Sequence, residues 1–140
     1  MRAQLTRVHC ESTRLGGITI MASNMKRIHS VAVKRMVDDS PDTSWLGEYA
    51  SRMERLNAGD WCFIGIRAEA KYSVGNSRAG YLQQTITSGG LWGIESDSDA
   101  SYLADVESEE LAILRAQLEE IGFSKRAITA AFKNVERENS

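Results

Sequence analysis

The sequence predicts one α+β domain, in which an antiparallel sheet of three to four strands packs against a long amphipathic helix and a C-terminal helix. Residues 61–74 alternate between apolar and largely polar side chains, which is typical of a strand with one face on a core. Residues 101–121 repeat apolar side chains at helical spacing. A length of 140 residues, with 42% hydrophobic and 26% charged, suits a single globular domain.

The first 24 residues differ from the rest because they mix Arg, Ser and Thr around a short apolar run at 17–22. We expect residues 1–24 to form a poorly ordered or accessory arm, or one short strand at 17–21, and residues 25–140 to form the domain. His9 and Cys10 are adjacent, so a strand would point them to opposite faces and would not pair them for catalysis.

Cysteine content and hydropathy favour a reducing cytoplasm. Cys10 and Cys62 are too few for a disulfide framework, and no CxxC pair is present. No apolar run approaches the ~20 residues that a membrane-spanning helix needs. The polar start lacks the apolar segment of a signal peptide. We therefore expect a cytoplasmic protein without membrane contact.

The strands are expected at 26–37, 61–74, 81–88 and, as a further short strand, 91–94. The first alternates imperfectly, so both of its faces are expected to be partly covered. A turn with the only proline, at 39–42, separates it from a short helix at 47–57. The glycine-containing segment 75–80 predicts a hairpin between the two strands around it.

The helix at 101–121 is the longest element, and Gly122 supplies its C-terminal cap. Glu107 and Glu110 fall within its apolar arc. Either the helix breaks near 105–108, or two carboxylates stand at the edge of the core. Ser124 can cap a last helix at 125–137. The expected core combines both layers: Val31, Val33, Ile64, Ile66, Ile86, Leu103, Leu111, Leu114, Leu118 and Phe132.

Charge is distributed unevenly along the chain. Residues 1–94 carry 12 Lys/Arg and 8 Asp/Glu, whereas residues 95–140 carry 5 and 11. Seven acids and no base occupy 95–110: Glu95, Asp97, Asp99, Asp105, Glu107, Glu109 and Glu110. Acids are favoured at a helix start by the helix dipole, so a solvated helix start is one interpretation. The other is an acidic docking surface for a basic partner.

The residues give no positive sign of an enzyme. The chain has two histidines and no nucleophile elbow, and His29 on a strand face suits a structural or surface role. Cys62 has the apolar parity of its strand, which predicts a buried structural thiol. We expect no catalytic residues and no cofactor.

Two apparent ligand motifs fail at their strict positions. Glu95, Asp97 and Asp99 resemble the start of a calcium loop, but Ala100 and Val106 stand where that loop needs glycine and glutamate. Capping of the following helix explains these side chains better. The glycines at 89, 90 and 93 lack the lysine and Ser/Thr of a phosphate loop, so turn geometry explains them. We therefore expect no metal site.

The last two helices, joined at 122–124, resemble a helix-turn-helix. Arg126, Lys133 and Arg137 would form a basic face on the second helix. The first helix carries acids that would repel DNA. A nucleic-acid-binding regulator using this C-terminal helical hairpin is therefore the alternative function.

Three segments resemble a family of small proteins encoded by phages, plasmids and bacterial genomes, for which no catalytic residues are established. They are SPDTSWLGEYA at 40–50, NAGDWCFIGIRAEA at 57–70 and the run from QTITSGGLWGIESDSD to EEIGF at 84–123. The similarity covers roughly residues 26–123. The chain departs from the family in a shorter link between Ala50 and Arg55, and in residues 1–24 and 124–140.

The resemblance implies a mobile-element protein in a bacterial host cell. Such proteins often inhibit host defence, and anti-CRISPR proteins do so by binding the effector complex, some through an acidic surface that imitates nucleic acid. A row of acids approximates the charge of DNA and steers association with a basic channel. We expect a non-enzymatic inhibitor that binds a host defence protein or CRISPR effector complex, not nucleic acid, through Trp92 and the seven acids at 95–110.

Overall fold

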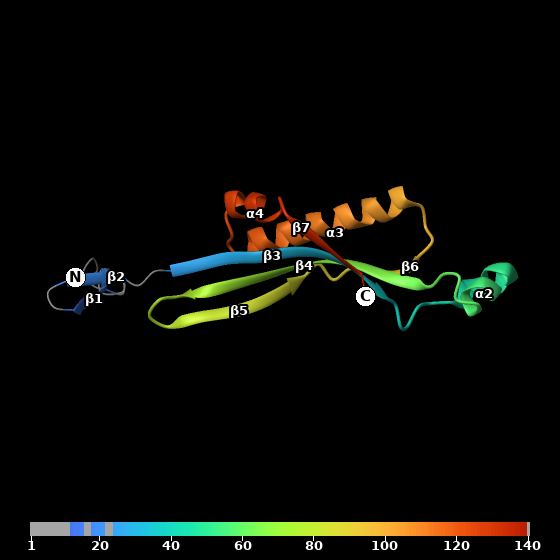
Figure 1. The fold of residues 1–140 in the computed structure, drawn as a ribbon, viewed down its shortest axis with the longest axis horizontal. Coiled ribbons are helices and arrows are strands. Elements are labelled where there is room, and N and C mark those ends of the chain that lie inside the picture. The colour runs from blue at the N-terminus through green and yellow to red at the C-terminus, as the bar shows by residue number, and fades with distance from the viewer. Residues whose placement is uncertain (1–11, 16–17, 22–23, 140) are drawn as a thin grey trace.

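A computed structural model of the chain describes residues 12–15, 18–21 and 24–139, and it has an α+β fold (Figure 1). Its main sheet has five strands: β3 (Asn24–Val37), β4 (Phe63–Asn76), β5 (Gly80–Thr87), β6 (Leu91–Glu95) and β7 (Val135–Asn139). The strand order is β5-β4-β3-β7, and β6 also pairs with β4. β5 pairs with 69–76 of β4 and β6 with 63–66, so the two follow each other along one edge of β4.

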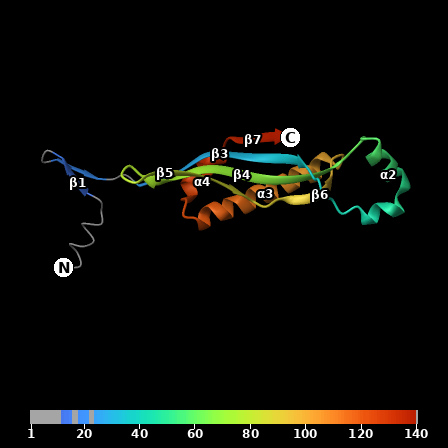
Figure 2. The same cartoon turned by 90° about the horizontal axis from the view of Figure 1, so that it is seen from below.

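Two helices cover one face of this sheet. They are α3 (Ala100–Glu120) and α4 (Lys125–Ala131), which lie on the same side of β3 and β4 in Figure 1. The 3₁₀ helix η1 (Ser44–Glu48) and α2 (Ala50–Asn57) lie at the end of the sheet where β4 begins (Figure 2). The strands β1 (Ser12–Leu15) and β2 (Ile18–Met21) form a separate antiparallel pair.

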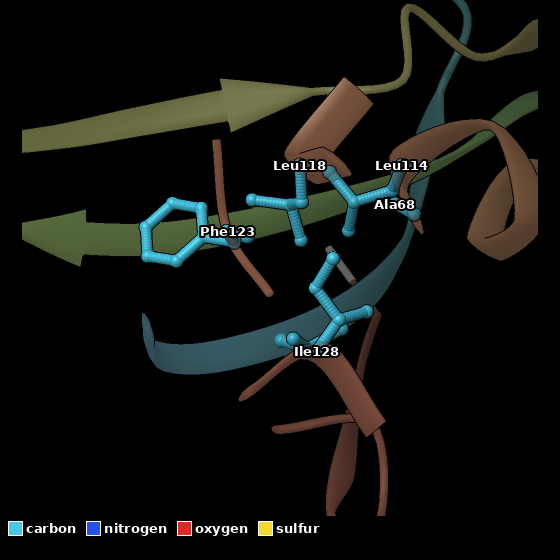
Figure 3. Packing of buried hydrophobic residues seen from close by; sticks show 7 residues of the cluster. Ala68, Leu114, Leu118, Phe123 and Ile128 are labelled. Atoms are coloured by element: carbon cyan, nitrogen blue, oxygen red, sulfur yellow. The ribbon is translucent and has the colours of Figure 1, made fainter. Parts of the chain in front are cut away.

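The core lies between the sheet and the helices. Ala68 of β4, Leu114 and Leu118 of α3, and Ile128 of α4 converge with Phe123 in Figure 3. Of the expected core residues, most are buried, and Ile86, Leu111 and Phe132 pack against the core while partly buried. The expected α+β class is confirmed. The apolar face of the strands and the apolar side of α3 pack against each other in the same core.

The C-terminal segment corrects the sequence prediction of a helix at 125–137. α4 ends at Ala131, and Val135–Asn139 form a strand parallel to β3. The sheet is therefore mixed and five-stranded, not antiparallel with three to four strands. Val135 packs against the core as a strand residue, and its parity partner Arg137 reaches Glu107 on the same face, so tertiary pairing overrides the helical spacing.

The expected arm at 1–24 lies largely outside the described residues, and so do His9 and Cys10. The alternative of one short strand at 17–21 corresponds to β2, whose pairing with β1 was not anticipated. The short helix expected at 47–57 is present as η1 followed by α2. Among the described helices, none combines the length and the apolar character needed to cross a membrane.

Candidate protein-interaction site

Glu107 is buried and ties three elements together. It lies on the core-facing side of α3 with 5% of its surface exposed. Arg35 of β3 donates from Nε to its Oε2 at 3.0 Å, and Arg35 Nη2 forms an ion pair with the same oxygen at 2.9 Å. Arg137 of β7 approaches its Oε1 with Nε at 3.4 Å. Two guanidinium groups thus compensate the loss of water around one carboxylate.

Glu110 is also buried, and its carboxylate forms a hydrogen bond with Ser88 between α3 and the sheet. Ser88 Oγ donates to Glu110 Oε1 at 2.6 Å, and the same hydroxyl accepts from the Ala68 N–H at 2.9 Å. α3 is continuous through this region, so the expected alternative of two carboxylates at the core edge is confirmed. Glu107 and Glu110, which the sequence analysis places in the acidic docking surface, are 5% and 6% exposed and face the sheet.

Glu95 and Asp97 are held by Arg52 of α2. Arg52 donates to both Asp97 oxygens at 2.8 and 2.9 Å, and also to Glu95 Oε1. The hydrogen bonds from Arg52 hold the pKa of Asp97 below its ordinary value, and the two carboxylates raise the pKa of Arg52. The guanidinium also stacks 4.0 Å from the ring centre of Trp61. These two acids therefore lock α2 to the turn before α3.

Replacing Arg52 by alanine is expected to lower the midpoint of thermal unfolding by a few degrees, because ion pairs and a cation–π contact are lost together. The pKa of Asp97 is depressed in the folded state, so this stabilisation is full above the unfolded value of about 3.9 and is lost as the pH falls through the folded value. Scanning calorimetry from neutral to acidic pH should show that the difference in melting temperature between Arg52→Ala and the wild type becomes smaller below about pH 4.

The matched control is Arg55→Ala, one turn further along α2. Arg55 is 55% exposed and makes one ion pair with Asp60 at 3.5 Å. Its loss should leave the melting temperature almost unchanged. Equal effects of the two variants would contradict the role of Arg52.

Asp99, Asp105 and Glu109 remain on the outside of the protein. Asp99 occupies the N-cap position of α3, but its side chain makes no capping hydrogen bond. Asp105 and Glu109 are one helical turn apart on the outer side of α3, near Tyr102, which is 46% exposed. Of the seven acids in 95–110, these three are both exposed and free of an ion pair within the described residues.

Trp92 lies on the other face of the sheet, away from α3. A Cβ added at Gly65 of β4 would overlap the ring of Trp92. Gly65 alternates with Ile64 and Ile66, which pack against α3, so Trp92 covers the opposite face. Its Nε1 donates to the Gly89 carbonyl at 3.1 Å, yet 43% of its surface is exposed. The structure therefore does not bring Trp92 and the outer acids of α3 onto one surface.

Two further exposed aromatic residues, Trp45 and Tyr49, lie near the start of β4, on the face of the strand that Trp92 covers. The ring of Trp45 packs edge-on against Phe63, with centroids 6.2 Å apart, and Phe63 precedes Gly65 by two residues on the same face of β4. Tyr49 packs against Trp45 at 6.0 Å. Trp45 is 39% exposed and Tyr49 is 53% exposed. We call Trp45, Tyr49 and Trp92 the aromatic surface.

Buried aromatic residues support this surface from below. Phe63 and Trp61 pack at 4.9 Å and form a small core with Leu46 under η1 and α2. The Trp61 indole N–H donates to the Arg52 carbonyl at 3.2 Å. Because these buried rings pack underneath, the exposed rings have few accessible rotamers. Binding through them therefore loses little side-chain entropy.

The middle of the same face carries paired ions instead of apolar groups. Lys34 lies 3.0 Å from Glu69 and 3.3 Å from Glu138, and Arg67 lies 3.3 Å from Glu69. The hydrogen bond to Glu69 raises the pKa of Lys34. This ion-pair cluster limits the aromatic surface to the end of the sheet near η1.

Sequence reasoning named Trp92 as a partner-binding residue but did not name Trp45 or Tyr49, which lie on the same face of the sheet. The available signal was Gly65, an isolated glycine within a strand, which often marks a close approach of another group. No spacing along the chain reveals which ring fills that space, because Trp92 comes from a strand 27 residues later.

His29 and Ser73 form an unanticipated pair. The His29 Nε2 and Ser73 Oγ atoms are 2.5 Å apart beside a polar cavity of about 460 Å³ that Lys71, Gln83 and Thr85 also line. Ser73 is only 2% exposed, so its hydroxyl is covered and not presented to a substrate. The pair is consistent with the expected structural role of His29.

The C-terminal helix differs from its sequence prediction, and so does the burial of Cys62. α4 ends at Ala131 and Arg137 belongs to β7, so the basic face of Arg126, Lys133 and Arg137 expected on a helix at 125–137 is not formed on one helix. Cys62 is a partly buried free thiol beside the core. Within the described ranges, no group of three His, Cys, Asp or Glu side chains is placed to hold a metal ion.

Neither a family model, nor a curated protein, nor a solved structure matches this chain.

Proposed function

We propose that this chain is a non-enzymatic interaction protein of a phage or plasmid, which binds and inhibits a host defence complex in the bacterial cytoplasm. A CRISPR effector complex is the specific target that we propose. The observation that carries the binding function is the aromatic surface, where three partly exposed rings share one end of a sheet face. The mobile-element setting rests on the resemblance of residues 26–123.

Exposed aromatic clusters are typical of protein interfaces. Tryptophan and tyrosine are enriched among the few residues that supply most binding energy, since each buries a large area at small entropic cost. Trp45, Tyr49 and Trp92 expose 39%, 53% and 43% of their surfaces, so all three retain area to bury in a complex. We therefore assign to this surface the affinity for the partner.

The outer acids of α3 have a separate part in this proposal. Asp105 and Glu109, together with Glu119 and Glu120 further along α3, are exposed on the helix side of the molecule. Charges outside the contact raise the rate of association with a basic partner more than they raise affinity. We propose that they steer the chain to a basic complex, which the aromatic surface then holds.

Affinity capture tests the partner. The tagged chain is used as bait in lysate from bacteria that carry CRISPR and other defence systems, and bound proteins are identified by mass spectrometry. The double variant Trp45→Ala/Trp92→Ala is the parallel bait. We expect a defence subunit in stoichiometric amount on the wild-type bait and its loss from the variant.

Capture of the same subunit by both baits would remove the aromatic surface from the proposal. Recovery of nucleic acid without a protein partner would contradict the inhibitor function itself. An immunity assay gives the functional readout: expression of the wild-type chain should restore plaque formation by a phage that the host's CRISPR system targets.

The steering role predicts a kinetic difference. Asp105→Lys/Glu109→Lys should slow association with the captured partner about tenfold at low salt and leave dissociation unchanged. Stopped-flow or surface-based kinetics at several salt concentrations checks this. An accelerated dissociation instead would place these acids in the contact.

A further inference from the structure

β5 is an unprotected edge of the sheet. It ends the strand order, and residues 81–85 are exposed. No charged residue lies between Arg78 and Glu95. Natural edge strands usually carry charges, prolines or bulges that prevent pairing with another strand. The other edge, β7, has such protection in Glu136, Arg137 and Glu138.

The outward hydrogen-bonding groups of β5 can be assigned from its pairing. The Ser88 N–H donates to the Ala68 carbonyl of β4 at 2.9 Å. Alternate residues of an antiparallel strand direct their main-chain groups to opposite sides, so Tyr81, Gln83 and Thr85 direct theirs away from β4. Thr87 has the same direction, and its carbonyl accepts from Gln117 Nε2 of α3 at 3.1 Å. α3 thus closes one end of the edge, and within the described part of the chain the outward main-chain groups of the other three residues have no hydrogen-bond partner.

The outward main-chain groups of Tyr81, Gln83 and Thr85 can pair with the same three residues of a second copy. If two copies pair antiparallel about a two-fold axis at Gln83, Tyr81 stands opposite Thr85 of the partner copy, and Gln83 stands opposite its own equivalent. Each such pair exchanges both of its main-chain hydrogen bonds. The free groups of the edge are then all used, and the pairing stops before Thr87, whose carbonyl is already occupied.

The side chains of β5 favour the same arrangement. Leu82 and Tyr81 are 58% and 53% exposed, so both have apolar area that pairing with a second strand can bury. In the paired strands Tyr81 would lie across from a β-branched threonine, a favourable cross-strand combination. Leu82 would lie diagonal to Leu82 and Ile86 of the second copy, on the helix side of both sheets. No like charges would face each other.

We propose that the chain forms a two-fold homodimer through antiparallel pairing of β5 with β5 of a second copy, centred on Gln83. The two sheets join into one, with both sets of helices on the same side. The aromatic surface remains free in each copy, because it lies at the other end of β4 and on the opposite face from α3.

Gln83→Lys and Gln83→Glu test the two-fold axis. Either variant alone places two like charges opposite each other and should weaken self-association about tenfold or more, as measured by sedimentation equilibrium. An equimolar mixture of the two variants should restore the dimer as a mixed pair. Asn139→Lys, which adds the same charge at the β7 edge, should sediment as the wild type does.

Hydrogen exchange supplies a readout that does not depend on substitution. The amide protons of Tyr81, Gln83 and Thr85 should become more protected as the wild-type concentration rises. A wild-type chain that is monomeric at all concentrations would overturn the proposal, and it would leave the edge available to a strand of another protein. A dimer that persists in both single variants would also overturn it, because its interface would lie elsewhere.

Discussion

Leu114→Ala is expected to lower the free energy of unfolding by about 3–5 kcal/mol. Leu114 is fully buried in the cluster formed by α3, α4 and the sheet (Figure 3). Truncation removes apolar contacts and leaves a cavity that surrounding side chains from three elements cannot easily fill. Urea denaturation followed by circular dichroism measures the loss.

The neighbouring position supplies the control. Ile113 belongs to the same helix but is 43% exposed, so Ile113→Ala should cost less than about 1 kcal/mol. Both substitutions introduce alanine, so helix propensity favours neither strongly. Similar losses in the two variants would mean that α3 packs through a different face.

Glu107→Ala has the second largest expected effect, a loss of about 2–3 kcal/mol in the free energy of unfolding. Removing one member of a buried ion pair usually costs about 3–5 kcal/mol. The loss is smaller here because Arg35 and Arg137 are 36% and 63% exposed, so water can hydrate both guanidinium groups after the carboxylate is gone. Denaturation in urea at neutral pH gives the value.

Glu109→Ala is the matched control, because it removes the same group from the outer side of α3. It should change the free energy of unfolding by no more than about 0.5 kcal/mol. The two variants also distinguish an acid with a structural role from an acid proposed to act in binding. Glu107→Ala should lower stability, whereas Glu109→Ala should not. Equal stability of both variants would contradict the buried link between α3, β3 and β7.

The sequence predicts most of the fold because local pattern and tertiary environment agree there. From Arg67 onward β4 alternates between polar and apolar side chains, since only the face with Ala68 and Ala70 meets α3. α3 shows a helical apolar arc along 21 residues. β7 was missed because Ile128, Ala131, Phe132 and Val135 also fit helical spacing. Only the parallel pairing of Val135 with Val31, more than a hundred residues away, makes this segment a strand.

The candidate site was less predictable because it depends on long-range contacts. An acid within an apolar arc is ambiguous until its partners are known, and Glu107 finds Arg35 at a separation of 72 residues. Trp92 is partly exposed, but its face of the sheet is set by the space above Gly65, which no local sequence pattern reveals. The seven acids at 95–110 form one cluster in the sequence, but they have three different environments in the structure. Two are buried in the core, two form ion pairs with Arg52, and three are exposed on the outer surface.

The most direct measurement of the central claim is the affinity of purified variants for the captured partner by titration calorimetry. Trp92→Ala should weaken binding about 30-fold or more, as expected of a hot-spot tryptophan. Gly65→Ala should weaken it as well, because the new methyl group displaces the ring while Trp92 itself is retained. Tyr102→Ala removes a ring of similar exposure, 46%, from the helix side and should bind like the wild type. Unchanged affinity in both Trp92→Ala and Gly65→Ala would contradict binding through the aromatic surface.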